Sequence, residues 1–572
     1  MPKITVDGKE IQFTEKKKLL PFLLETDNEV PYFCWHPEMS IPTNCRMCLV
    51  EVGYQMKDKD TKELLVNEDG SQKIQWGFKP VTSCNNDLVD GMFVKTNRTS
   101  PIIDKAQKGV LEFMLINHPL DCPICDQAGE CPLQINTYKY GPEGSRFEVS
   151  KVHKPKRIEL GPRVTLDAER CINCTRCVRF TEEISKSDQL SIVARGDKNF
   201  PATAPGKVFD EPYSMNVIDI CPVGALTSDD FRFKARAWEM NFTPGICVHD
   251  SMGTNIDVWV RDNLVMRLTP RYNENINKYW IADENRLAYQ KYNENRVSGI
   301  KVQGDIPVDF EQGLQYAAQL LNQHKNKILF IASAHASVES LFALTTLAKQ
   351  YNSPQPYYVP HSVENRADNF LLTNDLTPNS AGCQLLGLNK TTTQDLIQLI
   401  QNQGTQLVYL MEDDAVAAEL VAQLSGKVKF IIHSTNYFQN HDQVTVLIPA
   451  TTSIEAPGTY INSKNIPQVT MQAKQIKQMT PEMWMAMPKS RLDSAAVAMD
   501  NWRNQQNIVD CLPSWMLISK IAAYANQNLN FNSHKEIFTK IKTQYESLKD
   551  LKLLKKNRKE SFKISQLEFA IN

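Results

Sequence analysis

The sequence predicts a multidomain chain that combines α+β and α/β domains, and three observations support this fold class. Its 572 residues are enough for several domains, and its 42% hydrophobic and 23% charged fractions are typical of globular proteins. Twelve of the 14 cysteines lie before residue 248, mostly in tight clusters. Beyond residue 320, short apolar runs alternate with helical patterns, which indicates a parallel sheet covered by helices.

Charge and hydropathy exclude some classes of function. The formal net charge of −1 argues against nucleic acid or an anionic membrane surface as the main partner. No run of about 18 apolar residues occurs, so no transmembrane helix is expected. The chain opens with a strand-like run and a turn, without a signal-peptide pattern, so we expect it to stay in the compartment where it is made. Clustered cysteines in such a chain indicate metal ligands, not a disulfide framework.

The first cysteine group comprises Cys34, Cys45, Cys48 and Cys84. The two-residue gap between Cys45 and Cys48 lets both sulfurs reach one small inorganic core, and four thiolates satisfy a [2Fe–2S] cluster. Upstream, residues 4–6 and 10–13 flank Asp7-Gly8, a pattern typical of a β-hairpin. We therefore predict a small β-rich ferredoxin domain here, with a structural zinc site as the alternative.

The second group comprises His118, Cys122, Cys125 and Cys131. Ser100-Pro101 is typical of a helix start, and the apolar spacing after it predicts an amphipathic helix that ends just before His118. Because the cysteines of this group lack a fourth thiolate, we expect His118 to complete a [4Fe–4S] site. A neutral imidazole in place of a thiolate makes such a cluster less negative and alters its potential. A Cys3His zinc site is the alternative.

The third group comprises Cys171, Cys174, Cys177 and Cys221. Repeated two-residue gaps and a Cys-Pro step are the bacterial ferredoxin pattern for a [4Fe–4S] cluster. Phe180 occupies the position of the usual fourth cysteine, so Cys221 is expected to close this site. Arg46, Arg176 and Arg179 flank expected ligands; they could raise cluster potentials, although ordinary surface pairing is an equally good interpretation.

These three groups together resemble the large peripheral-arm iron–sulfur subunit of NADH:quinone oxidoreductase, respiratory complex I. Residues 44–51, 117–130 and 219–225 are similar to that family nearly residue for residue, and the close match covers roughly residues 1–290. A polar segment at about 54–76 departs from it and is interpreted as an inserted hairpin away from the ligands.

The resemblance implies a role in a larger enzyme. Such a subunit takes electrons from a flavin (FMN, NADH-binding) subunit and passes them toward downstream iron–sulfur and quinone-site subunits. It is peripheral to the membrane, on the cytoplasmic face of the bacterial inner membrane or the mitochondrial matrix side, and has no catalytic residue, NADH site or quinone site of its own. The implied domains are a β-grasp [2Fe–2S] domain at 1–97, a His/Cys3 [4Fe–4S] segment at 98–150, a [4Fe–4S] ferredoxin-like domain at 151–236, a vestigial fourth-cluster domain at 237–295 and a molybdopterin-oxidoreductase-like scaffold at 296–572.

A fourth cluster is tested by counting positions. Relatives that carry one have Cys-x2-Cys-x3-Cys-x27-Cys, and counting from Cys247 places the other three positions at Asp250, Thr254 and Ala282. One thiolate cannot hold a cubane, so we expect no fourth cluster and treat Cys247 as a small buried residue.

The C-terminal half is predicted to keep an α/β fold without its chemistry. Strands are expected at 327–332, 406–411, 427–432 and 444–448, with helices at 338–349 and 415–424. Residues 454–462 resemble a segment of the molybdopterin-oxidoreductase fold. No G-x-G-x-x-G or Walker motif occurs, and Cys383 is expected in the core, so we predict no molybdopterin.

Other classes of protein compete with this prediction. A soluble formate dehydrogenase needs the fourth cluster and a metal-binding residue, and an iron-only hydrogenase needs several more cysteines in the second half, where only Cys383 and Cys511 occur. An NAD-linked hydrogenase subunit and a zinc-stabilised scaffold also remain open. The basic stretch at 552–559 is interpreted as a solvated tail, with a partner-docking strip as the alternative.

Overall fold

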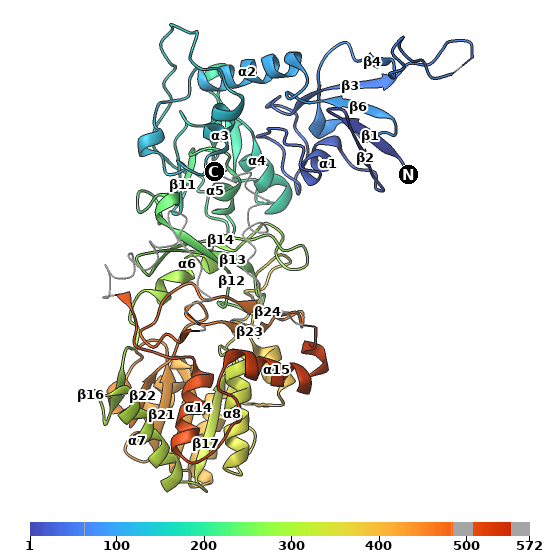
Figure 1. The fold of residues 1–572 in the computed structure, drawn as a ribbon. Helices are drawn as coiled ribbons and strands as arrows, with labels where there is room; N and C mark the ends of the chain where they lie inside the picture. Colours follow the sequence, from blue (N-terminus) through green and yellow to red (C-terminus); the bar gives the residue numbers. More distant parts are fainter. Residues whose placement is uncertain (62, 482, 484–506, 551–572) are drawn as a thin grey trace. The chain divides into compact units, whose positions relative to one another are not determined.

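The computed structural model describes all residues except 62, 482, 484–506 and 551–572 (Figure 1). The basic stretch at 552–559 therefore lies outside the described residues. The chain divides into two compact units, the first ending at Ala237 and the second beginning at Trp238, and each is described by itself. None of the helices in the described residues is long and apolar enough to cross a membrane.

The first unit opens with the predicted hairpin. Strands β1 (Lys3–Val6) and β2 (Lys9–Gln12) pair antiparallel, and the turn residues Asp7 and Gly8 both have positive φ, 47° and 84°. This left-handed turn suits glycine at the second position, which confirms the hairpin. The sheet order is β2-β1-β6-β3-β4, with β5 also on β3. Its remaining strands are β3 (Leu49–Gln55), β4 (Ile74–Trp76), β5 (Val81–Thr82) and β6 (Met92–Lys95).

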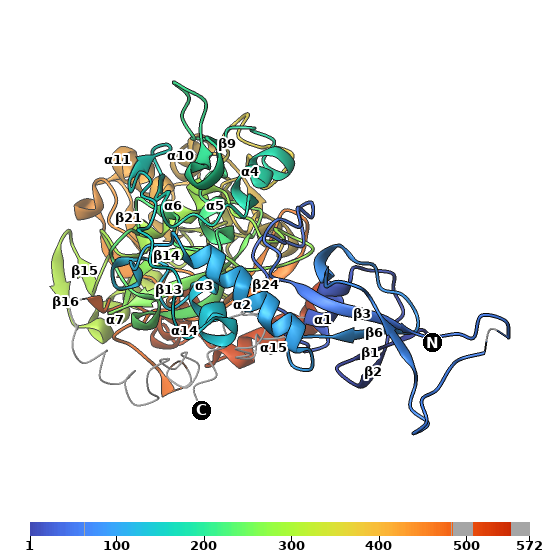
Figure 2. The same cartoon turned by 90° about the horizontal axis from the view of Figure 1, so that it is seen from above.

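The segment between β3 and β4 forms the predicted insert. Antiparallel bridges join Lys57 to Leu64 and Val66 to Gln72, so this segment folds back on itself beyond the sheet (Figure 2). Helix α1 (Leu19–Glu25) packs its buried leucines and Phe22 under the other end of the sheet, close to the thiols of Cys48 and Cys84 in one apolar core.

The helix predicted before the second cysteine group is α2 (Pro101–Leu115). The Ser100 hydroxyl accepts a hydrogen bond from the amide of Ile103 at 3.2 Å, and Pro101 takes the first position, as the sequence indicates. A single turn, η2 (Cys122–Ile124), follows, and Cys131 then precedes α3 (Pro132–Tyr140). The second group therefore lies in the loop that connects two helices.

The third group is carried by a small α+β segment. Strand β8 (Val164–Leu166) lies between β7 (Ile158–Glu159) and β11 (Leu226–Ser228), and β9 (Ser191–Val193) pairs with β10 (Phe200–Ala202). Helix α4 (Arg176–Arg179) continues into the wider turn η3 (Phe180–Ile184), and α5 (Asn216–Ile220) ends at Cys221. Cys177 thus lies in the first turn of α4, and Cys221 directly follows α5.

The second unit begins with a three-stranded antiparallel sheet followed by a large mixed sheet. The small sheet holds β12 (Asn241–Ile246), β13 (Asn255–Arg261) and β14 (Leu264–Pro270), and α6 (Asp283–Leu287) follows it. The large sheet has the order β16-β15-β22-β21-β20-β17-β18-β19. Its strands are β15 (Ile300–Val302), β16 (Ile306–Val308), β17 (Ile328–Ser333), β18 (Tyr357–Val359), β19 (Asn389–Lys390), β20 (Leu407–Met411), β21 (Lys429–Ser434) and β22 (Val446–Pro449).

The six strands from β22 to β19 are parallel, which confirms the strands and helices predicted for this half. Alternate residues of β17 enter two different cores: Phe330 packs with α7 (Phe310–Gln323), α8 (Val338–Gln350) and α14 (Ser514–Tyr524), and Ile331 packs with α10 (Thr393–Asn402) and α11 (Asp414–Leu424). Helices therefore cover both faces, as a parallel sheet requires. The remaining elements are α9 (Ser380–Leu385), α15 (His534–Gln544) and the hairpin of β23 (Gly458–Ile461) and β24 (Pro467–Thr470).

Candidate metal centres

The four thiols of the first group lie together beside the N-terminal sheet. Cys34, Cys48 and Cys84 are at most 2% exposed, and Cys45 is half-buried. A hydrogen bond between the thiols of Cys34 and Cys45 raises the pKa of Cys34 and lowers that of Cys45. Cys48 and Cys84 form the same kind of pair, with the pKa of Cys48 raised and that of Cys84 lowered. The two pairs also act on one another electrostatically, so the structure brings all four predicted residues into one group.

The three cysteines of the second group also lie together, at the loop between α2 and α3. Cys125 and Cys131 are buried, whereas Cys122 is exposed. Burial, with smaller contributions from charge on Cys125 and Cys122, raises the pKa of the Cys131 thiol to about 12. A thiol buried in this way needs a cationic partner to hold it ionised.

His118 is the predicted fourth member of this group. Its Nδ1 atom is buried and has no hydrogen-bond partner among the described residues. Burial, reinforced by the charge of Arg170, lowers the pKa of His118 to about 4, so the imidazole is neutral at neutral pH. Arg170 acts on the thiol of Cys125 as well, where it opposes the effect of burial. A neutral ring with a free nitrogen is the form of histidine that binds metal.

The third group lines a cavity of its own. Cys171, Cys174, Cys177 and Cys221 line one cavity, and the rest of its wall is mainly apolar, with Leu166, Ile192, Pro201, Val223, Ala225 and Leu226. Burial raises the pKa of Cys171 to about 12 and that of Cys174 to about 11. Asn173 and Thr175 have φ values of 53° and 61°, and this winding turns the Asn173 amide toward the Cys171 sulfur at 3.4 Å. Burial raises the pKa of the Cys221 thiol as well, and the amides of Val223, Ala225 and Leu226 oppose that rise.

In the described residues, no three His, Cys, Asp or Glu side chains have the geometry to hold a single metal ion. The predicted thiols of each group therefore lie near one another, but among the described residues no three of them surround a common metal position.

The Cys221-Pro-Val-Gly224 segment belongs to two groups at once. Cys221 is in the third group, whereas the carbonyl oxygen of Pro222 lies 3.7 Å from the Cys131 sulfur of the second. A Cβ atom at Gly224 would be only 2.1 Å from the Cys125 sulfur. This glycine leaves room for a sulfur of the neighbouring group, a role that the sequence pattern alone did not reveal.

A buried ion network next to the second and third groups was also missed from the sequence. Arg170, only 4% exposed, pairs with Asp121 at 2.9 Å and Asp167 at 3.2 Å, and Lys156 bonds to Glu169 at 2.7 Å. The sequence feature that could have indicated this network is the position of Arg170 directly before Cys171. A guanidinium held by two carboxylates is fixed in place and keeps its charge.

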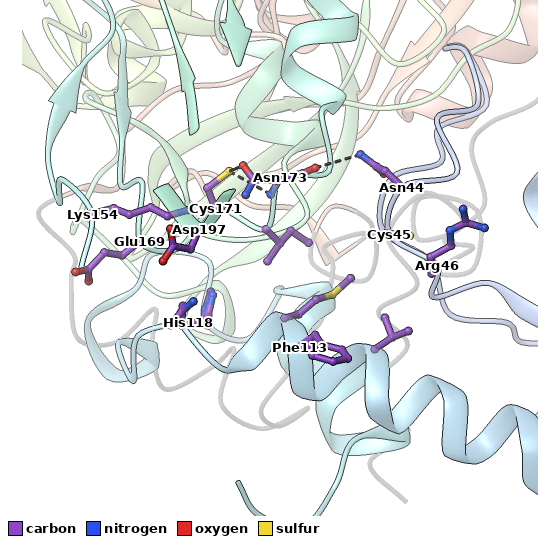
Figure 3. A pocket seen from close by; sticks show the side chains of 14 residues that line it. Asn44, Cys45, Arg46, Phe113, His118, Lys154, Glu169, Cys171, Asn173 and Asp197 are labelled. Carbon is purple, nitrogen blue, oxygen red and sulfur yellow. Dashed lines mark hydrogen bonds between the residues drawn. The ribbon is translucent and has the colours of Figure 1, made fainter. Parts of the chain in front are cut away.

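One cavity of about 380 Å³ is lined by a member of each group, namely Cys45, His118 and Cys171 (Figure 3). Across it, the side-chain amide of Asn44 donates to the carbonyl oxygen of Asn173 at 3.1 Å. Arg46 is exposed and also lines this cavity. Cysteines of the first and third groups therefore adjoin one space within the first unit, together with His118.

The four positions counted for a fourth cluster, together called the fourth position, lie in the second unit and hold one thiol. Cys247 is 2% exposed, as predicted, and Asp250, Thr254 and Ala282 are fully buried. Asp250 accepts a hydrogen bond from Asn285 at 3.0 Å and pairs with Arg366 at 3.2 Å. The Cys247 thiol points to the carbonyl oxygen of Asn285 at 3.9 Å. An ion pair and an amide therefore surround the one thiol that remains.

Three groups of mostly buried cysteines, the first beside a small sheet, indicate a class of protein: an iron–sulfur protein built from ferredoxin-type domains. Comparison with family models agrees for each segment. The chain matches a 2Fe-2S iron-sulfur cluster binding domain (residues 2–99), an NADH-ubiquinone oxidoreductase-G iron-sulfur binding region (107–146), an NADH-quinone oxidoreductase subunit 3 ferredoxin-like domain (161–227) and an NADH-ubiquinone oxidoreductase NDSU1/NuoG-like 4Fe-4S domain (240–290).

The particular resemblance is to the large iron–sulfur subunit of NADH-quinone oxidoreductase, known as the G subunit in bacteria. The chain is 38% identical to that protein of Rickettsia felis over 357 residues, which are 62% of this chain and 50% of the relative. It is 39% identical to the NADH-ubiquinone oxidoreductase 75 kDa subunit of Reclinomonas americana over 366 residues, 62% of this chain and 49% of that one. The chain thus spans about half the length of the curated relatives it matches, and the resemblance predicted from its motifs is confirmed over that part. A solved NAD+-reducing [NiFe]-hydrogenase chain aligns more loosely, at 26% identity and a TM-score of 0.33, over 41% of this chain and 90% of its own.

Proposed function

We propose that this chain is an electron-relay iron–sulfur subunit of a complex I type NADH:quinone oxidoreductase. The observation that carries the proposal is the third group: four thiols line one mainly apolar cavity, and backbone amides favour the charged form of Cys221. Thiolate ligands, amide donors and an apolar wall are what an iron–sulfur cluster requires.

The residues of each group fit a cluster. We assign a [2Fe–2S] cluster to Cys34, Cys45, Cys48 and Cys84, and a [4Fe–4S] cluster to Cys171, Cys174, Cys177 and Cys221. A second [4Fe–4S] cluster is assigned to His118, Cys122, Cys125 and Cys131. The unpartnered Nδ1 of His118 and the missing Cβ of Gly224 beside Cys125 support this second assignment.

The bound clusters would supply one-electron oxidation and reduction with little change in ligand geometry. The chain's own residues would hold them, keep water from the third site and place fixed charge nearby. Arg170 has this last role at the second site, because its guanidinium is buried and acts on both His118 and Cys125.

No fourth cluster is proposed, although residues 240–290 match a 4Fe-4S domain model. Three of the four ligand positions hold Asp250, Thr254 and Ala282, and the buried Asp250–Arg366 ion pair lies where further ligands would be needed. The residues here do not fit a cluster.

The finer fold assignments are part of this proposal. The N-terminal sheet supports a β-grasp domain at 1–97, followed by cluster domains at 98–150 and 151–236 and the vestigial domain at 237–295. The parallel sheet supports a molybdopterin-oxidoreductase-like scaffold at 296–572 that lacks the cofactor. Its Cys383 is fully buried among apolar side chains, which suits a core residue better than a metal ligand.

The proposed partners are those that the family resemblance implies. We propose that an FMN- and NADH-binding subunit supplies electrons and that other iron–sulfur and quinone-site subunits receive them. The chain would then be a peripheral subunit on the cytoplasmic face of a bacterial inner membrane, or on the matrix side in an organelle.

Iron and sulfide analysis of the anaerobically purified chain, with EPR after reduction, tests the proposal. One binuclear and two tetranuclear clusters give about ten irons per chain. An iron-free protein would overturn the proposal, and about fourteen irons would contradict the loss of the fourth cluster. Cys383→Ala is the matched control, because this cysteine is buried in the other unit and should leave the iron content unchanged.

A further inference from the structure

Two arginines of the third group reach into the loop that carries Cys34 of the first group. Arg176 donates to the carbonyl oxygen of Trp35 at 2.6 Å and to that of Ile220 at 3.0 Å. Trp35 directly follows Cys34, and Ile220 directly precedes Cys221. One guanidinium therefore joins the backbone beside a ligand of the first site to the backbone beside a ligand of the third.

Arg179 makes the same connection one helical turn further along. Its guanidinium donates to the carbonyl oxygen of Ser40 at 2.6 Å and to that of Cys34. The Ser40 amide in turn donates to the Glu183 carboxylate at 2.7 Å. The loop from Cys34 to Ser40 is thus held at both ends by side chains from the segment of the third group.

The two guanidinium groups are not ordinary surface pairs. Arg179 is 6% exposed, and Arg176 is half-buried. In the part of the chain that the structure describes, no carboxylate lies within ion-pair distance of either one. Their acceptors are backbone carbonyl oxygens and, for Nε of Arg179, the Thr175 hydroxyl at 3.4 Å; these neutral oxygens orient the groups without cancelling their charge.

This charge lies beside sulfur ligands of both sites. Arg176 lines the cavity of the third group together with Cys174, Cys177 and Cys221, and Arg179 bonds to the carbonyl oxygen of Cys34 itself. The two arginines are therefore fixed positive charges placed between the first and third sites.

We propose that Arg176 and Arg179 are positioning residues that dock the Cys34 loop onto the third site and raise the reduction potentials of both clusters together. The inference rests on the proposed function, since it needs the two clusters. Reduction adds one negative charge to a cluster, and a fixed cation nearby stabilises the reduced form more than the oxidised form. Because the same two charges face both sites, one substitution should move both potentials in the same direction.

The test is a redox titration followed by EPR on the full chain with Arg176→Gln and Arg179→Gln made singly. Each should lower the equilibrium constant for one-electron reduction of the [2Fe–2S] cluster and of the third-site cluster by about tenfold, which is about 59 mV for a one-electron couple. The second-site cluster should shift far less. Hydrogen–deuterium exchange of residues 33–40 should become faster in both variants, because the carbonyl groups of this loop lose their guanidinium donors.

Arg176→Lys and Arg179→Lys separate charge from docking. Lysine keeps the positive charge but cannot donate to two carbonyl groups with one planar fork. These variants should keep potentials closer to those of the unchanged chain and still show faster exchange at 33–40. Arg195→Gln, an exposed arginine in the same unit, is the matched control.

The inference would be overturned if the reduction potentials of the glutamine variants differ no more from those of the wild-type chain than the potentials of Arg195→Gln do. It would also be overturned if only one of the two clusters shifts. Unchanged exchange at 33–40 would overturn the docking role. If the wild-type chain binds no cluster, the proposed function is refuted instead. The hydrogen–deuterium exchange experiment would still test the docking role.

Discussion

The third cysteine group and the fourth position are built from similar sequence patterns but have opposite interiors. The third has four sulfurs around a mainly apolar cavity, with backbone amides directed at them. The fourth has one sulfur, Cys247, beside a carboxylate, an amide and a guanidinium that satisfy one another. Residues 240–290 still match a 4Fe-4S domain model. A segment that matches a cluster-domain model can therefore hold an internal ion pair at an expected ligand position, and we propose that it binds no cluster.

The largest expected effect comes from removing one sulfur at the third site. Cys174→Ser should abolish the third-site EPR signal and lower the iron content by about four per chain, because a tetranuclear cluster needs all of its ligands. Iron analysis and EPR measure both changes. A spectrum identical to that of the unchanged chain would show that this cavity holds no cluster.

An intermediate effect is expected at the fourth position. Arg366→Leu leaves the fully buried Asp250 without its cation and should destabilise the second unit by about 3–5 kcal/mol, with the iron content unchanged. Denaturant unfolding, followed by circular dichroism, measures this loss.

This loss should depend on pH. Burial raises the pKa of Asp250 above that of the unfolded chain, so ionisation of this carboxyl opposes folding once the pH exceeds about 4. Arg366 offsets that cost, and the destabilisation in Arg366→Leu should therefore be larger at about pH 7 than at about pH 4.5. An equal loss at both pH values would mean that Asp250 is not the group left unpaired.

The smallest effect is expected from the remaining sulfur of the fourth position. Cys247→Ala should leave iron content and EPR signals unchanged and cost about 1 kcal/mol, since it removes one buried atom from a packed core. A loss of iron in this variant would show that Cys247 binds a cluster after all, and the comparison between the two sites would fail.

Much of this fold could be predicted from the sequence, because local patterns determine its elements. The Asp7-Gly8 turn, the Ser100 helix cap and the parallel strands of the second half all depend on neighbouring residues. The grouping of the thiols followed from their spacing in the chain. The assignment of each cluster to its ligands stays a prediction.

The arrangement around the groups could not be predicted, since it depends on residues far apart in the sequence. Arg179 and Cys34 are separated by 145 positions, and Arg366 and Asp250 by 116. Arg176 and Arg179 had surface pairing as an equally good interpretation, and only their acceptors and burial identify them as internal charges. Gly224 belongs to a family motif, but no local pattern shows that a sulfur of another group lies against it.

The four residues from Cys221 to Gly224 have a consequence for how the protein matures. They form one wall of the second site and supply a ligand to the third. Inserting a cluster at the third site would fix this segment and so complete the second pocket, which favours a set order of cofactor loading. Because this wall is shared, a substitution in it should disturb the second and third sites together.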